Sequence, residues 1–112
     1  MKKEPIPKKD IERDMDSLFL CDEQTRIIDC TTAMHELLGY TKEEFLTLTL
    51  VDFDLFETTE SLKEKLREAK KHGCVHMKTI HKRKDGTSLL VNEQIDYLQD
   101  KKLYQCFIKE EK

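Results

Sequence analysis

The pattern of hydrophobic and polar positions between residues 33 and 45 predicts two short helices joined at Gly39. Ala33, Leu37 and Leu38 form an apolar stripe with helical spacing, and the stripe stops at a glycine. Glycine is well suited to the left-handed conformation in which many helices end. The pattern therefore predicts that the first helix ends there.

The second helix is predicted to begin at Thr41 through a capping box. The Thr41 hydroxyl is spaced to accept from the backbone N–H of Glu44, whose carboxylate reaches back to the N–H of Thr41. Tyr40 before the cap and Phe45 inside the helix have the spacing of a hydrophobic staple. Two short helices that meet at a fixed angle are suited to walling a pocket.

Apolar runs of strand length occur towards both ends of the chain. They lie at residues 18–21, 26–30, 74–84, 87–98 and 103–108. The first two runs flank a polar turn and predict a hairpin. The last three are separated by Asp85-Gly86 and by the polar residues 99–102, and they predict an antiparallel meander.

One long helix is predicted between the two groups of strands. It begins at Thr58 or Thr59 and ends at Gly73. Its apolar stripe consists of Leu62, Leu66 and Ala69. Residues 48–56 have no clean period, and they predict irregular turns that line the interior.

The Asp85-Gly86 dipeptide favours a two-residue type I′ turn, which sets a register for the hairpin around it. This register places Lys84 opposite Thr87, Ile80 opposite Val91 and Lys78 opposite Glu93. Val91 then shares one mostly apolar face with Leu89 and Ile95. The element order predicts an α+β fold with a five-stranded antiparallel sheet, and with the short helices and the longer helix on one face.

The N-terminal residues predict a short segment that precedes this domain. Residues 1–9 read as a flexible tether, and residues 10–17 as an amphipathic helix that precedes a single domain over residues 18–109. The apolar edge of the helix consists of Ile11, Met15 and Leu18, which are candidates for a dimer interface.

Composition and charge limit the kinds of partner that the domain is expected to bind. Of 112 residues, 38% are charged, so the domain has few positions for a large core. The net charge of −3 has both signs interspersed and gives no basic footprint for nucleic acid. No apolar run approaches a membrane span or a signal peptide, so we expect no membrane contact by this segment and a cytoplasmic location.

The cysteines and histidines do not predict a metal site. Cys21, Cys30, Cys74 and Cys106 contain no CxxC pair and read as reduced, buried residues. His72, Cys74 and His76 alternate, but Gly73 interrupts their alignment. His35 and His81 have no evident partner and are expected to be exposed. The three glycines form no phosphate loop and the serines no nucleophile elbow, so we expect no enzyme activity.

Two motifs give the chain a resemblance to the PAS domain family, over residues 16–108. The segment IIDCTTAMHELLGYTKEEF resembles the family's second strand and first helices, and KRKDGT resembles its hairpin after the long helix. Thr31 stands where the family often has asparagine and is expected to cap the following helix. The resemblance implies a sensory or dimerisation module of signalling proteins such as histidine kinases.

Several modes of action follow from this resemblance. The domain could bind a small apolar ligand, pack as a homodimer or against a partner signalling domain, or act without ligand as an interaction domain. The candidates for lining a ligand pocket are Phe19, Thr31, Tyr40, Phe45, Leu50, Phe53, Phe56 and Val91. The cofactor is unknown. A haem or flavin sensor is a further alternative, with His72 as the haem candidate, but no light-sensing cysteine signature is present in residues 47–56.

Overall fold

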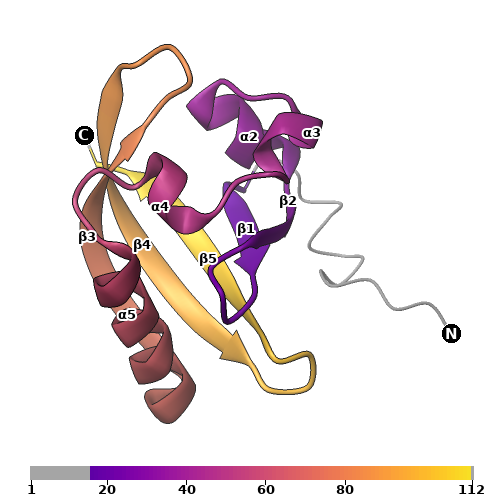
Figure 1. The fold of residues 1–112 in the computed structure, drawn as a ribbon, viewed down its shortest axis with the longest axis vertical. Helices are drawn as coiled ribbons and strands as arrows, with labels where there is room; N and C mark the ends of the chain where they lie inside the picture. The colour runs from indigo at the N-terminus through magenta and orange to yellow at the C-terminus, as the bar shows by residue number, and fades with distance from the viewer. Residues whose placement is uncertain (1–15, 112) are drawn as a thin grey trace, which may run out of the picture.

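The computed structural model describes residues 16–111, in which four helices separate two groups of strands (Figure 1). The elements are β1 (Leu18–Cys21), β2 (Ile27–Cys30), α2 (Thr32–Leu38), α3 (Lys42–Phe45), α4 (Leu50–Phe53), α5 (Thr59–His72), β3 (Cys74–Lys82), β4 (Ser88–Leu98) and β5 (Leu103–Glu110). Each of the predicted strands and helices within this range is present, with boundaries shifted by a few residues at most.

The strands form one antiparallel sheet in the order β2-β1-β5-β4-β3. The last strand, β5, lies between β1 and β4, so it joins the N-terminal hairpin to the C-terminal meander. The helices gather on one face of the sheet, with α5 across β3 and β4 (Figure 1). The predicted α+β fold is confirmed.

The joint between α2 and α3 follows the sequence closely. Gly39 has a φ of 86° in the left-handed region and ends α2. The Thr41 hydroxyl accepts from the Glu44 N–H at 3.1 Å, and the Glu44 carboxylate accepts from the Thr41 N–H at 2.9 Å. The rings of Tyr40 and Phe45 lie 6.1 Å apart, as expected of a staple. Both helix ends are therefore fixed by local contacts.

The segment predicted as irregular turns contains one turn of helix, α4. The Asp52 carboxylate accepts from the Thr49 N–H at 2.8 Å and starts this turn. Leu50 and Phe53 are buried against the sheet, and Asp54 ends the turn in an extended conformation. This geometry carries the Asp54 side chain into the interior.

The long helix α5 covers the sheet with its apolar stripe. The Thr58 hydroxyl caps it by accepting from the Ser61 N–H at 3.0 Å, and Gly73 ends it. The buried residues are Leu62, Leu66 and Ala69, as predicted. In α2 the predicted stripe is confirmed in part: Leu38 is buried and Leu37 packs against the core, but the other buried residue is Met34, which was not in the stripe. Within residues 16–111, no helix combines the length and apolar character needed to cross a membrane.

Between Arg83 and Thr87, the last hydrogen-bonded pair of the β3–β4 hairpin, the loop has three residues and not two. The Arg83 N–H donates to the Thr87 carbonyl at 2.7 Å, the Gly86 N–H donates to the Arg83 carbonyl at 2.9 Å, and Gly86 has a φ of 93°. A type I turn followed by a left-handed glycine is a common three-residue hairpin loop. The Asp85-Gly86 dipeptide fits this loop because the Asp85 carboxylate accepts from the Thr87 N–H at 3.0 Å.

The longer loop shifts the predicted register by one residue and reverses the faces of β3. Val91 pairs with Thr79 rather than Ile80, and Glu93 pairs with Met77 rather than Lys78. The predicted pairs Ile80–Val91 and Lys78–Glu93 are therefore wrong. Thr79 and His81 lie buried on the inner face instead.

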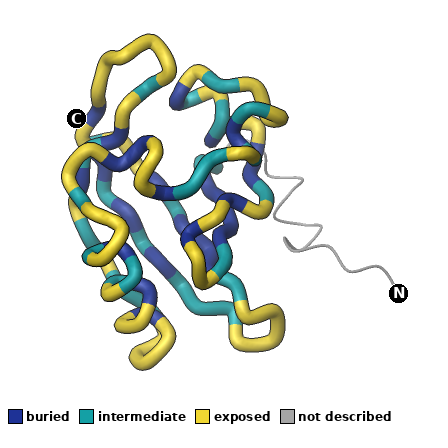
Figure 2. The backbone as a smooth tube through the Cα atoms, viewed as in Figure 1, coloured by how far each residue is buried: buried dark blue, intermediate teal, exposed yellow. Residues whose placement is uncertain are grey.

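Apolar residues pack on both faces of the sheet. Figure 2 shows buried positions alternating with more exposed ones along β4, as expected for a strand with one face on the core. The main core lies between this inner face and the helices. A second group, here called the outer apolar cluster, packs on the other face and consists of Leu18, Leu20, Leu98, Leu103 and Phe107.

Most of the predicted N-terminal segment, residues 1–17, lies outside the described residues. This applies to the tether at residues 1–9 and to most of the helix predicted at residues 10–17, including Ile11 and Met15. Leu18, the third residue of the predicted dimer edge, is the first residue of β1 and belongs to the outer apolar cluster.

The conformation of Gly86 gives a direct test of the hairpin loop. We expect Gly86→Ala to lower the free energy of unfolding by about 1–2 kcal/mol, the cost of a left-handed L-residue. A Cβ at this position meets no atom within 4 Å, so the effect comes from the backbone alone. Gly86→Asn should cost less, because asparagine tolerates this conformation better. Urea unfolding of the three proteins measures the difference, and equal stability of all three contradicts the loop.

Candidate functional site

Three of the predicted pocket residues pack directly against one another in the core. Phe19, Phe45 and Phe53 are fully buried. Their ring centroids lie 6.1 Å apart for Phe19 and Phe45, 5.8 Å for Phe19 and Phe53, and 5.2 Å for Phe45 and Phe53. Separations in this range are those of aromatic rings in contact. The three rings therefore occupy the space between them.

The remaining pocket candidates divide into core and surface residues. Leu50 and Val91 are buried beside the aromatic rings, and Tyr40 is half-buried against Phe45. Phe56 lies on the surface with 66% of its area exposed. Phe56 is therefore wrong as a candidate for lining an interior pocket.

Thr31 is buried, but its side chain does not cap α2 as expected. Its hydroxyl donates to the backbone carbonyl of Asp16 and accepts from the Leu18 N–H at 3.2 Å. The threonine thus ties the start of β1 to the start of α2. Its role in this structure is to hold the two elements together.

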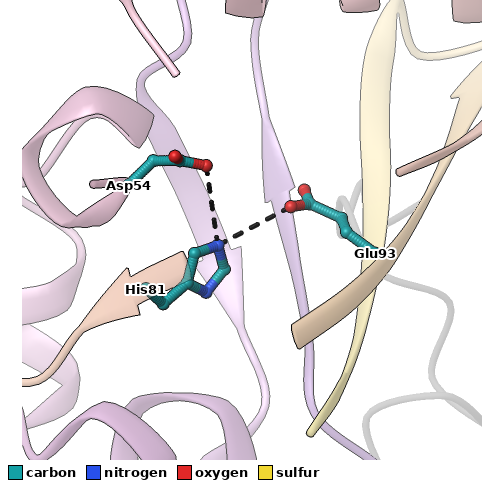
Figure 3. Close-up of side chains that lie close together, drawn as sticks. All are labelled: Asp54, His81 and Glu93. Carbon is teal, nitrogen blue, oxygen red and sulfur yellow. Dashed lines mark ion pairs between the residues drawn. The ribbon is translucent and has the colours of Figure 1, made fainter. Parts of the chain in front are cut away.

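A group of polar side chains lies buried on the inner face of the sheet, next to Phe53. Asp54, His81 and Glu93 converge from the end of α4, from β3 and from β4 (Figure 3). The His81 Nε2 atom lies 3.9 Å from Asp54 Oδ2 and 3.6 Å from Glu93 Oε1. The imidazole side chain is 1% exposed and the two carboxylates 3%. We call these three residues the polar cluster.

Hydrogen bonds from β3 and from the loop after α4 hold the Asp54 side chain in place. Its Oδ1 atom accepts from the Thr79 hydroxyl at 2.8 Å and from the backbone N–H groups of Phe56 and Glu57 at 3.0 and 2.8 Å. Three donors on one oxygen fix the orientation of the carboxyl group. The other oxygen, Oδ2, faces His81.

His81 is held by packing more than by hydrogen bonds. The Phe53 ring meets the imidazole edge to face, with centroids 5.1 Å apart and planes at 87°. The Nδ1 atom of His81 is buried and has no hydrogen-bond partner among the described residues. The expectation that His81 is exposed is wrong. His35, also expected to be exposed and without a partner, is half-buried, and its Nδ1 lies 2.8 Å from the Tyr40 carbonyl oxygen.

The buried Cys106 thiol lies next to Glu93 of the polar cluster and next to the Cys21 thiol. Burial raises the pKa of Cys106 on β5 well above its ordinary value, and the neighbouring Cys21 thiol and Glu93 carboxylate raise it further. Cys21, Cys30 and Cys106 are buried and form no disulfide among the described residues, as expected, whereas Cys74 is only half-buried. The inner face thus places a carboxylate beside a thiol that stays protonated at neutral pH.

Sequence reasoning missed the polar cluster, although one signal for it was present. Leu89, Val91 and Ile95 were assigned to one inward face, and Glu93 has the same spacing on the strand. The burial of His81 depended on the register of β3, which the two-residue turn gave wrongly. Nothing in the pattern of residues 48–56 indicated that Asp54 turns inward.

The outer face of the sheet carries the other histidine and cysteine of interest. Cys74 Sγ lies 3.9 Å from His76 Nδ1, and His76 Nε2 lies 3.1 Å from the Gln94 side-chain oxygen. His76 also borders a groove of about 650 Å³ that includes Phe107. His72, the haem candidate, is exposed in the last turn of α5.

The sheet order β2-β1-β5-β4-β3, with the helices on one face, is that of a PAS fold, and comparison with known proteins agrees. The sequence profile of the PAS domain family matches residues 15–110. The chain therefore belongs to the PAS domain family. No curated protein sequence is a significant match.

Solved structures extend this comparison. The PAS domain of an HTR-like protein from Haloarcula marismortui is 16% identical, with a TM-score of 0.80 over 95% of this chain and 100% of that chain. A PAS domain from Colwellia psychrerythraea is 18% identical, with a TM-score of 0.77 over 93% and 92%. A domain of a sensory box sensor histidine kinase/response regulator from Geobacter sulfurreducens is 17% identical, with a TM-score of 0.71 over 91% and 93%. These structures establish the shared fold.

The cysteines provide a test of the interior. We expect a thiol reagent to label only Cys74 in the folded protein, because the other three thiols are buried. Burial, with the nearby Asp96 carboxylate, raises the pKa of Cys74, so labelling should accelerate as the pH rises and more thiolate forms. Counting labelled thiols by mass spectrometry, with Cys74→Ser as the control, measures both effects. Rapid labelling of Cys106 in the folded state contradicts the structure.

Proposed function

We propose that this PAS domain is a sensory module in signal transduction, which regulates a partner or downstream domain such as a histidine kinase. Its state is passed on through a change in how the domain packs against a second copy or against that partner. Membership of the PAS family supports the sensory role. The origin of one similar structure, a sensor histidine kinase/response regulator, supports the class of partner.

The outer apolar cluster is the observation that carries this proposal. Leu98, Leu103 and Phe107 are only partly buried, and they lie around Leu18 and Leu20 on the face opposite the helices. The partly exposed area of Leu98, Leu103 and Phe107, continuous with buried apolar residues, is suited to an interface with another chain or segment. Leu18 pairs with Phe107 across β1 and β5, so contact at this surface bears directly on the central strands.

The packing of the core favours this route over an apolar ligand in the interior. The Phe19, Phe45 and Phe53 rings are in mutual contact, so a ligand among them would have to separate them. Each such aromatic pair contributes about 0.5–1.5 kcal/mol beyond its buried area, which the ligand would need to replace. A full core is the arrangement expected of an interaction domain.

A charge on the outer apolar cluster should prevent self-association. We expect Leu103→Glu and Phe107→Glu to convert a wild-type dimer into monomers, because each buries a carboxylate at the interface. Native mass spectrometry and light scattering measure the mass of each protein. Phe56→Glu is the matched control, since Phe56 is exposed outside this cluster and its substitution should leave the dimer intact.

The same spectra separate the competing modes of action. A wild-type dimer of bare chains supports regulation by packing. A mass excess that disappears on denaturation identifies a retained ligand or cofactor and favours the ligand route. A wild-type monomer at all concentrations contradicts self-association and restricts the proposal to a different partner domain.

A further inference from the structure

The polar cluster has the composition of a metal-binding site. Asp54, His81 and Glu93 each offer one ligand atom, and these three atoms lie within 4.8 Å of one another. Imidazole nitrogen and carboxylate oxygen are donors that divalent transition metals accept readily. All three side chains are buried, which sets the cluster apart from the acidic groups on the surface.

The distances within the cluster are longer than hydrogen bonds. His81 Nε2 lies 3.6 Å from Glu93 Oε1 and 3.9 Å from Asp54 Oδ2, whereas N–H···O hydrogen bonds span about 2.7–3.2 Å. Two ligand atoms on one tetrahedral metal ion, each about 2.1 Å from it, lie ~3.4 Å apart. The two distances from His81 Nε2 are within about half an ångström of this separation, and the two carboxylate oxygens lie within 4.8 Å of each other. A metal ion among the three atoms therefore needs the two carboxylates to draw closer to it, with His81 nearly in place.

The composition of this part of the core gives a further argument. Asp54 and Glu93 place two acidic side chains in the core, where an ionised carboxylate needs a compensating partner. A divalent cation held by all three side chains would compensate both carboxylates.

The surroundings orient the ligands. Asp54 Oδ1 is occupied by the Thr79 hydroxyl and two backbone N–H groups, which leaves Oδ2 directed at the centre of the cluster. Phe53 fixes the plane of the His81 ring by edge-to-face contact. Outer contacts of this kind hold metal ligands in position.

We propose that Asp54, His81 and Glu93 bind a divalent transition-metal ion such as Zn²⁺. The site lies on the inner face of the sheet, away from the outer apolar cluster, so this inference does not depend on the proposed function. The expectation of no metal site rested on the cysteine spacing, on the interrupted alignment of His72, Cys74 and His76, and on the lack of an evident partner for His81. The structure places Asp54 and Glu93 beside His81.

Titration with Co²⁺ tests the proposal, because bound Co²⁺ absorbs visible light in a way that reports its ligands. The 112-residue chain is first stripped with a chelator and then titrated, with Zn²⁺ added as a competitor. We expect one ion to bind per chain. Glu93→Gln and Asp54→Asn should each weaken binding at least ~10-fold, since losing even an outer partner of a ligand has an effect of this size.

The variants are chosen to keep the fold. Asp54→Asn retains a side-chain oxygen that can accept from the Phe56 and Glu57 N–H groups, and glutamine has the shape of glutamate. His76→Gln is the matched control, because His76 lies on the same strand as His81 but is exposed beside Cys74 and offers the obvious competing site. It should leave Co²⁺ affinity unchanged. Circular dichroism verifies that each variant is folded.

Imidazole NMR of the wild-type protein gives a readout that needs no variant of the cluster. Zn²⁺ should shift the signals of the buried His81 ring, and His76→Gln identifies the signal of the other β3 histidine. A shift at His81 with one ion per chain supports the site. Loss of affinity only in His76→Gln, a shift confined to His76, or no saturable binding overturns it.

Discussion

The alternation of side chains along β4 is the constraint on which the rest of the interior depends. This strand pairs with β3 on one side and β5 on the other, so both neighbours are set in register against it. Its inward positions place Leu89, Val91 and Ile95 in the core and, by the same period, Glu93. A carboxylate on this face has to be matched by polar groups from the surrounding elements. His81 and the Cys106 thiol lie beside Glu93, and Asp54, whose Oδ1 accepts from the Thr79 hydroxyl, faces the same imidazole.

Features governed by local sequence could be predicted well. Gly39, Thr41 and Glu44 define the joint between α2 and α3 through contacts only a few residues apart, and the structure reproduces it. The strand order of the meander likewise follows from its short turns. Such features depend on backbone conformations that one or two residues decide.

Features governed by register or by tertiary contact could not be predicted in the same way. Asp85-Gly86 is compatible with two hairpin loops, and the choice between them moved His81 from the expected surface position to the core. Phe56 was expected inside because it is aromatic, but hydrogen bonds from its own backbone to Asp54 hold its segment at the surface. The candidate site therefore had to be read from the structure, where residues from three elements meet.

One carboxylate connects the interior of this domain to its surface. Asp54 presents one oxygen to the buried histidine and the other to the backbone of residues 56 and 57, next to the exposed side chains of Leu55 and Phe56. A carboxylate is rigid, so rotating it to improve either set of contacts disturbs the other. One buried side chain thus touches both the polar cluster and the surface loop, so a displacement of Asp54 alters the contacts of both.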